Sequence, residues 1–114
     1  MLNIILFCLI SDTIDYCQSE HFNVTCPRND VILMTHAQYG RMRTGRCATH
    51  SAQLGCSVDV LPFFDQRCSG RRACVVYVAD PGINKLEPCA KDFTSYLSAA
   101  YVCVKGKLRD RVKW

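Results

Sequence analysis

Val-Ile-Leu-Met-Thr-His-Ala-Gln-Tyr-Gly-Arg, residues 31–41, is the longest β-prone run that follows the N-terminal segment. Apolar side chains occupy both faces at its start, and polar ones enter one face from His36 onward. This period-2 pattern predicts a strand that is buried at its beginning and half exposed at its end. We expect Gly40 to turn the chain there, with Tyr39 and Arg41 facing outward together.

Other segments predict a mixed α and β domain around this strand. Three more runs have the length and alternation of strands, residues 21–26, 73–79 and 96–103. A helix is expected near residues 59–67, opened by Ser57 or Asp59 as its cap and tolerating Pro62 only in its first turn. We expect residues 82–94 to form a loop.

The polar segment 42–56 predicts a surface loop. Arg43 and Arg46 lie within it and Arg41 immediately before it, so the three could form a patch that attracts anions. An ordinary solvated loop is the alternative.

Nine cysteines in 114 residues predict a disulfide framework formed in an oxidising compartment. No Cys-x-x-Cys pair is present. The spacing from Cys47 to His50 is typical of one pair of zinc ligands, but no second pair occurs elsewhere, so we expect neither a zinc site nor another cofactor. Eight cysteines allow on the order of a hundred pairings, and spacing alone does not choose among them.

The two ends of the chain differ in composition from the segment between them. Residues 1–11 are almost wholly apolar and are interpreted as a secretory signal peptide, with a truncated signal or a buried first strand as alternatives. Removing them would take away Cys8 and leave eight cysteines. Residues 105–114 are interpreted as a basic tail or linker, and 12–104 as one domain. The tail holds the whole net charge of +4, so we expect no nucleic-acid partner.

Two smaller patterns concern modification and catalysis. Asn23-Val24-Thr25 is an N-glycosylation sequon, which predicts that Asn23 lies on the surface. His21, His36 and His50 are scattered and have no recognisable nucleophile or carboxylate partner, so an enzyme is not expected.

The cysteines and several short motifs follow one another in a specific order. They are Cys17, Cys26, Tyr39-Gly40-Arg41, Cys47, Cys56, Gln66-Arg67-Cys68, Cys74, Glu87-Pro88-Cys89, Tyr96-Leu97 and Tyr101-x-Cys103. This order resembles the SUEL-type, or rhamnose-binding, lectin domain, which also occurs in latrophilin-type adhesion receptors. The resemblance implies an α+β fold: a small, disulfide-stapled antiparallel β-sandwich with one or two short helices. It also implies the disulfides Cys17–Cys47, Cys26–Cys103, Cys56–Cys89 and Cys68–Cys74.

The same resemblance implies a sugar site with altered side chains. Its ligand-binding positions in this chain are Gln18, Tyr39, Gly40, Arg41, Glu87, Lys91 and Ser95. Gln18 stands where the family pattern has Glu, Glu87 where it has Asp, and Ser95 where it has Lys. The loop at 90–95 is one residue longer than usual, and Lys91 or Asp92 could reach into the site from it. Each lost charged hydrogen bond costs about 1.5–3 kcal/mol, which predicts weak binding of rhamnose or galactose.

We therefore expect an extracellular carbohydrate-binding, lectin-like module with altered sugar-site residues. The alternative is an extracellular protein-interaction or adhesion module that uses the same scaffold without sugar. The expected partner is a cell-surface glycan or an extracellular protein. The chain would be secreted, or would lie on the extracellular face of a membrane protein as part of a larger receptor.

Overall fold

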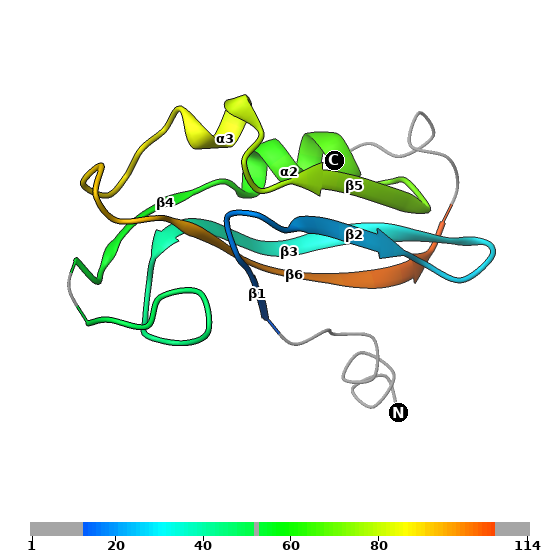
Figure 1. Ribbon diagram of the computed structural model, residues 1–114. Helices are drawn as coiled ribbons and strands as arrows, with labels where there is room; N and C mark the ends of the chain where they lie inside the picture. Colours follow the sequence, from blue (N-terminus) through cyan, green and yellow to red (C-terminus); the bar gives the residue numbers. More distant parts are fainter. Residues whose placement is uncertain (1–12, 52, 107–114) are drawn as a thin grey trace.

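Two antiparallel sheets and two short helices make up the described part of the chain, which is residues 13–51 and 53–106 of the computed structural model (Figure 1). The strands are β1 (Ile14–Tyr16), β2 (His21–Thr25), β3 (Asp30–Arg41), β4 (Cys56–Asp59), β5 (Ala73–Tyr77) and β6 (Tyr96–Lys105), and the helices are α2 (Leu61–Cys68) and α3 (Pro81–Asn84). The expected signal segment 1–11 and all but the first two residues of the expected tail lie outside the described residues.

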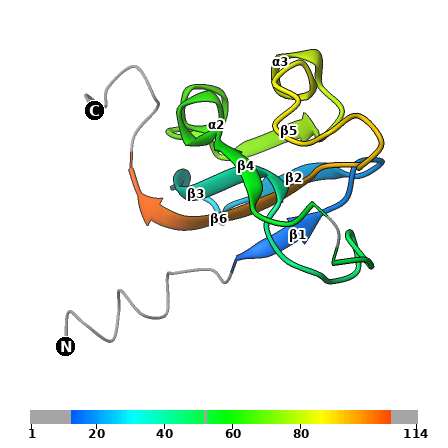
Figure 2. The same ribbon diagram turned by 90° about the vertical axis from the view of Figure 1, so that its left-hand side faces the viewer.

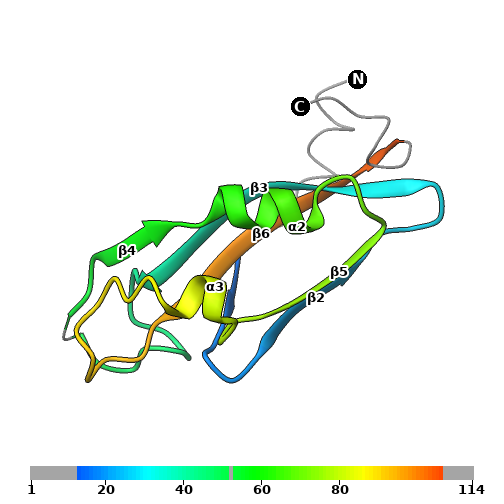
Figure 3. The same cartoon turned by 90° about the horizontal axis from the view of Figure 1, so that it is seen from above.

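The strands form a four-stranded sheet in the order β1-β6-β3-β4 and a two-stranded sheet, β2-β5. Figure 2 shows α2 and α3 on the same side of the larger sheet as β5, and Figure 3 shows α2 lying along β3 and β6. Within the described residues this is the α+β fold predicted from the sequence, a small disulfide-stapled antiparallel β-sandwich with two short helices.

The core fills the space between the sheets and beneath α2. Phe22 of β2 is fully buried, and its ring centroid lies 5.4 Å from that of Phe64 in α2 and 6.1 Å from that of Tyr101 in β6. Both pairs have the edge-to-face arrangement that aromatic rings favour. This cluster joins α2 and both sheets in one core.

A β-bulge in β3 changes which of its side chains face that core. The pairing of β3 with β6 shifts in register between Met34 and His36. Ile32 and Met34 therefore share the core with Ala37 and Tyr39, although strict alternation would put the two pairs on opposite faces. The predicted half exposure is seen at His36 and Gln38, which are partly exposed and alternate with buried Ala37 and Tyr39. The expectation that Tyr39 faces outward was wrong, because its side chain is only 2% exposed.

Gly40 and Arg41 also differ from the expectation of an outward turn. Gly40 stays within β3, between partners Ser57 on β4 and Tyr96 on β6. Its φ of +153° and the close approach of β4 explain the glycine, since a Cβ atom there would lie 2.1 Å from the carbonyl oxygen of Cys56. Arg41 is 5% exposed and points into the structure rather than to solvent.

The segment before α2 is a strand and not the start of the helix. Residues 56–59 form β4, which pairs with the end of β3, so Ser57 lies within a strand. Neither Ser57 nor Asp59 is the N-cap residue, because Val60 occupies that position; the Asp59 carboxylate nevertheless accepts a hydrogen bond from the Leu61 amide at 2.9 Å. Pro62 lies in the first turn of α2, as predicted.

Helix α3 overlaps the start of the segment 82–94, which was expected to be a loop. The Asp80 side chain accepts a hydrogen bond from the Gly82 amide at 2.7 Å, and Pro81 begins the helix. An Asp cap followed by Pro is a common helix start, so Asp80-Pro81-Gly82 opens a turn of helix here, while β5 already ends at Tyr77.

Four disulfides link the elements, with the pairing that the resemblance implies: Cys17–Cys47, Cys26–Cys103, Cys56–Cys89 and Cys68–Cys74. Strand β6 continues through Lys105, whose ammonium lies 3.6 Å from the Asp30 carboxylate, so the sheet extends one residue past the expected boundary. Neither helix in residues 13–51 and 53–106 is long and apolar enough to cross a bilayer.

Candidate functional site

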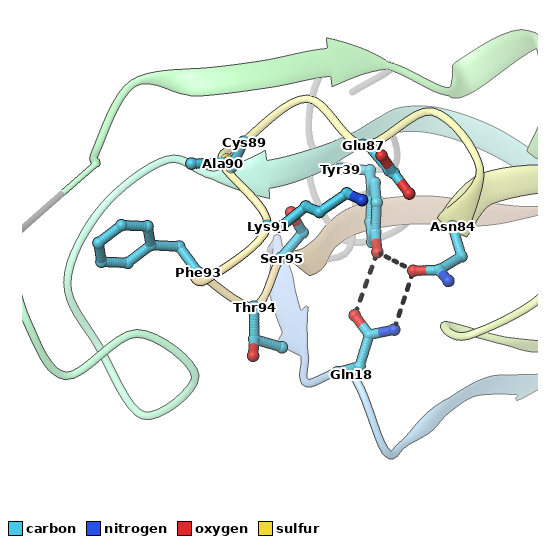
Figure 4. Close-up of a pocket in the computed structure, with 10 residues that line it drawn as sticks. All are labelled: Gln18, Tyr39, Asn84, Glu87, Cys89, Ala90, Lys91, Phe93, Thr94 and Ser95. Atoms are coloured by element: carbon cyan, nitrogen blue, oxygen red, sulfur yellow. Dashed lines mark hydrogen bonds between the residues drawn. The ribbon is translucent and has the colours of Figure 1, made fainter.

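A pocket of about 300 Å³ opens beside Tyr39, at the end of β3 (Figure 4). Three parts of the chain meet there: the turn after β1, the segment from α3 to Cys89, and the loop that leads into β6. The lining residues are Gln18, Tyr39, Asn84, Glu87, Cys89, Ala90, Lys91, Phe93, Thr94 and Ser95.

Gln18, Tyr39 and Asn84 converge in a hydrogen-bonded cluster, which we call the amide–tyrosine cluster (Figure 4). The Tyr39 hydroxyl lies 3.1 Å from both Gln18 Oε1 and Asn84 Oδ1, and it donates its single proton to one of them at a time. Gln18 Nε2 also donates to Asn84 Oδ1 at 3.2 Å. The ring of Tyr39 thus belongs to the core, while its hydroxyl belongs to the pocket.

The environment of Tyr39 keeps its hydroxyl protonated. Burial raises the pKa of Tyr39 above its ordinary value of 10.0, and the negative charge of Glu87 acts in the same direction. Hydrogen bonds with Gln18 and Ser95 act in the opposite direction but are outweighed. Tyr39 is therefore a neutral donor and acceptor at physiological pH.

The turn between β1 and β2 holds Gln18 in place. The Cys17–Cys47 disulfide anchors this turn immediately before Gln18, and the Glu20 carboxylate accepts a hydrogen bond from the Cys17 amide at 2.8 Å. The Arg46 guanidinium donates to both oxygens of Glu20, at 2.7 and 2.8 Å. These contacts lower the pKa of Glu20 to about 2, mainly through the hydrogen bond from Arg46.

Asn84 and Glu87 come from the end of α3 and the residues that follow it. Asn84 is the last residue of α3, so the Asp80 cap places it. Glu87 has a φ of +41°, a left-handed conformation that is uncommon for a residue with a side chain. Such strain is found where a surrounding structure holds a side chain in a functional position.

Arg41 supports the pocket from behind. Its guanidinium donates to the carbonyl oxygens of Thr94, at 3.1 Å, and His50, at 3.4 Å, and it lies 5.3 Å from the centroid of the Phe93 ring. Arg41 is not among the residues that line the pocket, and its contacts with Thr94 and Phe93 hold the 90–95 loop from behind.

The structure does not support an anion-attracting arginine patch, which the sequence left open beside an ordinary solvated loop. Arg43 pairs with the Asp15 carboxylate at 2.9 Å, and Arg46 pairs with Glu20. With Arg41 buried against backbone carbonyls, each of the three cations already has a partner.

Residues 24–103 match the model of the D-galactoside/L-rhamnose binding SUEL lectin domain. The chain belongs to this family. Its curated relatives include the adhesion G protein-coupled receptors L1 of Bos taurus and Homo sapiens, each 30% identical over 100 residues, which is 84% of this chain and 7% of the receptor. The receptor L1 of Mus musculus is 30% identical over 92 residues. The chain thus spans less than a tenth of the length of these relatives.

Most of the ligand positions implied by the SUEL resemblance meet at the pocket. Gln18, Tyr39, Glu87, Lys91 and Ser95 line it, whereas Gly40 and Arg41 do not. Lys91 extends into the pocket from the 90–95 loop (Figure 4), and Asp92 is not among the lining residues.

Five residues that line the pocket were not among the predicted ligand positions: Asn84, Cys89, Ala90, Phe93 and Thr94. The Asp80-Pro81 start of α3 is the signal that could have located Asn84, because it places this residue one helical turn beyond the cap. No local pattern distinguishes Phe93 and Thr94 from the rest of their loop.

Proposed function

We propose that this SUEL lectin domain is an extracellular carbohydrate-binding module and that its ligand binds in the pocket beside Tyr39. The observation that carries this proposal is the convergence of Gln18, Tyr39, Glu87, Lys91 and Ser95, from β3 and three other segments, on one pocket. The four disulfides support an extracellular location, because such bonds persist in oxidising compartments.

The chemical groups in the pocket suit vicinal sugar hydroxyls. Each hydroxyl both donates and accepts, and the pocket offers amides on Gln18 and Asn84, a carboxylate on Glu87 and a neutral hydroxyl on Tyr39. A few convergent polar groups of this kind orient a small ligand.

The specificity of this pocket should differ from that of the family pattern. Gln18 replaces a carboxylate with an amide that donates to Asn84, and Ser95 is 8% exposed and carries no charge. Lys91 supplies a cation from a different backbone position, so it meets a ligand from another direction. The side chains of the amide–tyrosine cluster must also break hydrogen bonds with one another before they can bind a sugar, which weakens binding.

A glycan array with the variant Tyr39→Phe tests this function. The change removes the hydroxyl but keeps the buried ring, so we expect the fold to remain and binding to fall about tenfold, the equivalent of one lost hydrogen bond of about 1.4 kcal/mol. Tyr77→Phe is the matched control, because Tyr77 is exposed on β5 and does not line the pocket. Equal binding by both variants would show that the ligand does not bind at the Tyr39 hydroxyl, and no binding by the folded wild-type chain would show the carbohydrate proposal to be wrong.

The second candidate is an extracellular protein-interaction or adhesion module. It is favoured by the amide–tyrosine cluster, in which Gln18, Tyr39 and Asn84 already bond to one another, and by relatives whose names describe adhesion receptors. A module of this kind would bind a purified extracellular partner equally well with and without excess free sugar. Competition by the sugar would instead assign the contact to the pocket.

A further inference from the structure

We infer that Asn23 carries an N-linked glycan whose first sugar packs on Val75 and Tyr77, covering the outer face of the β2–β5 sheet. This inference concerns another face of the molecule and does not rest on the carbohydrate-binding proposal.

The outer face of this small sheet brings the sequon and two apolar residues together. Asn23 pairs directly with Val75 in the antiparallel register, and Tyr77 pairs with His21, one position along the same face. Side chains opposite one another on a strand pair lie roughly 5 Å apart at Cβ, and diagonal ones roughly 7–8 Å apart. Both apolar side chains are therefore within reach of a sugar attached to Asn23.

These two side chains are the most exposed large hydrophobic residues of the described chain. Tyr77 is 62% exposed and Val75 is 52% exposed. They lie on a two-stranded sheet, where exposed apolar surface next to unpaired strand edges invites association with other chains. A bulky, soluble group over this face would prevent such association.

Asn23 meets the chemical requirements for the modification. Its side chain and that of Thr25, which completes the sequon, are exposed on the same face. No hydrogen bond of the Asn23 side chain occurs within residues 13–51 and 53–106. In the transfer, Nδ2 of Asn23 bonds to the anomeric carbon of a lipid-diphosphate-linked oligosaccharide. The bond from that carbon to the diphosphate oxygen breaks, and the amide loses one proton.

The attached sugar has a surface suited to this position. A pyranose ring presents C–H groups on its faces and hydroxyls at its rim, so it can lie over a tyrosine ring and a valine while its hydroxyls stay in water. The Tyr77 ring contacts the His21 ring edge to face, with the centroids 5.2 Å apart, and it remains 62% exposed to receive the sugar.

Mass spectrometry tests the attachment. The full chain is directed into the secretory pathway of cultured animal cells by an added signal, and the peptide containing Asn23 is analysed before and after enzymatic release of N-glycans. We expect a glycan at Asn23 that persists in Thr25→Ser and is lost in Thr25→Ala. An unmodified Asn23 in the secreted wild-type chain would overturn the inference.

Thermal unfolding tests the packing. Glycosylated and enzymatically deglycosylated samples are compared, so the polypeptide is already folded when the glycan is removed. We expect the glycan to raise the Tm of the wild-type chain by roughly 4 °C, and to have no such effect in Tyr77→Ala. Leu54→Ala is the control, because Leu54 is another exposed apolar residue but lies outside this sheet. The same glycan effect in Tyr77→Ala as in Leu54→Ala would overturn the packing.

Discussion

At Gly40 the backbone of β4 lies so close to β3 that there is no room for a side chain. A Cβ atom would lie 2.1 Å from the Cys56 carbonyl oxygen and 2.6 Å from Ser57 Cα, both backbone atoms. Gly40→Ala should therefore push β4 away from β3 and lower the free energy of unfolding by at least about 2 kcal/mol, since backbone strain alone costs about 1–3 kcal/mol. Denaturant unfolding measures this change.

Two other glycines separate the causes of that effect. Gly55 has a φ of +95° and no atom within 4 Å of a Cβ placed there, so Gly55→Ala introduces backbone strain without a clash. Gly45→Ala introduces neither strain nor a clash. We expect the loss of stability to be greatest for Gly40→Ala, smaller for Gly55→Ala and absent for Gly45→Ala. A loss at Gly40 no larger than that at Gly55 would contradict the close approach of the strands.

Residue identities predicted several residues that line the pocket, but they did not predict the direction of each side chain. The motif that contains Tyr39 and Arg41 was matched correctly, yet the tyrosine reaches the pocket and the arginine lies buried behind it. The difference arises from the bulge in β3 and from carbonyl groups that accept hydrogen bonds from Arg41, supplied by His50 and Thr94. These are tertiary contacts, which no local pattern in the sequence specifies.

At the scale of elements, the long apolar runs were predictable and the short connecting elements were not. The strand predicted from the run 31–41 and the predicted strand 96–103 agree with β3 and β6, because each carries enough apolar side chains to mark a buried strand. Strand β4 has only four residues, and what makes it a strand is its pairing with the end of β3 and its disulfide to Cys89. Its own residues are compatible with a helix start.

The turn between β1 and β2 should lose stability in acid. Glu20 in the folded chain has a pKa of about 2, compared with an ordinary value of 4.5. Unfolded chains therefore take up a proton at Glu20 well before folded chains do. The stabilisation by Glu20 is fully present above about pH 4.5 and is lost as the pH falls toward about 2.

Thermal unfolding of Glu20→Gln at several pH values measures this contribution. Gln still accepts a hydrogen bond but carries no charge, so the variant should be less stable than the wild type at pH 6 and equal to it near pH 2. Arg46→Gln should show the same pH dependence, because it removes the cation that lowers the pKa. A difference from the wild type that does not change with pH would contradict this role of Glu20.

At the scale of the whole molecule, the cysteine order identified the architecture where composition alone left it open. Nine cysteines indicated only that disulfides form, and on the order of a hundred pairings remained. The spacing relative to the short motifs selected one family, and the structure has the pairing which that family implies. Disulfide connectivity depends on how elements meet in space. The order of all the cysteines and motifs, matched to a family, therefore predicts it, whereas the spacing of neighbouring cysteines does not.

The four disulfides should contribute unequally to stability, according to the loops they close. Cys26–Cys103 spans 77 residues and Cys68–Cys74 only 6. In the chain-entropy view, closing the longer loop contributes about 4.5 kcal/mol and closing the shorter one about 2 kcal/mol.

The paired variant Cys26→Ala/Cys103→Ala should therefore lose about twice as much free energy of unfolding as Cys68→Ala/Cys74→Ala, measured by denaturant titration. Cys26, Cys68 and Cys74 belong to the core and Cys103 packs against it, so both paired variants remove a disulfide from the core region and differ most in loop length. Equal losses would instead mean that local packing around each bond, and not closure of the chain, determines what these cross-links contribute.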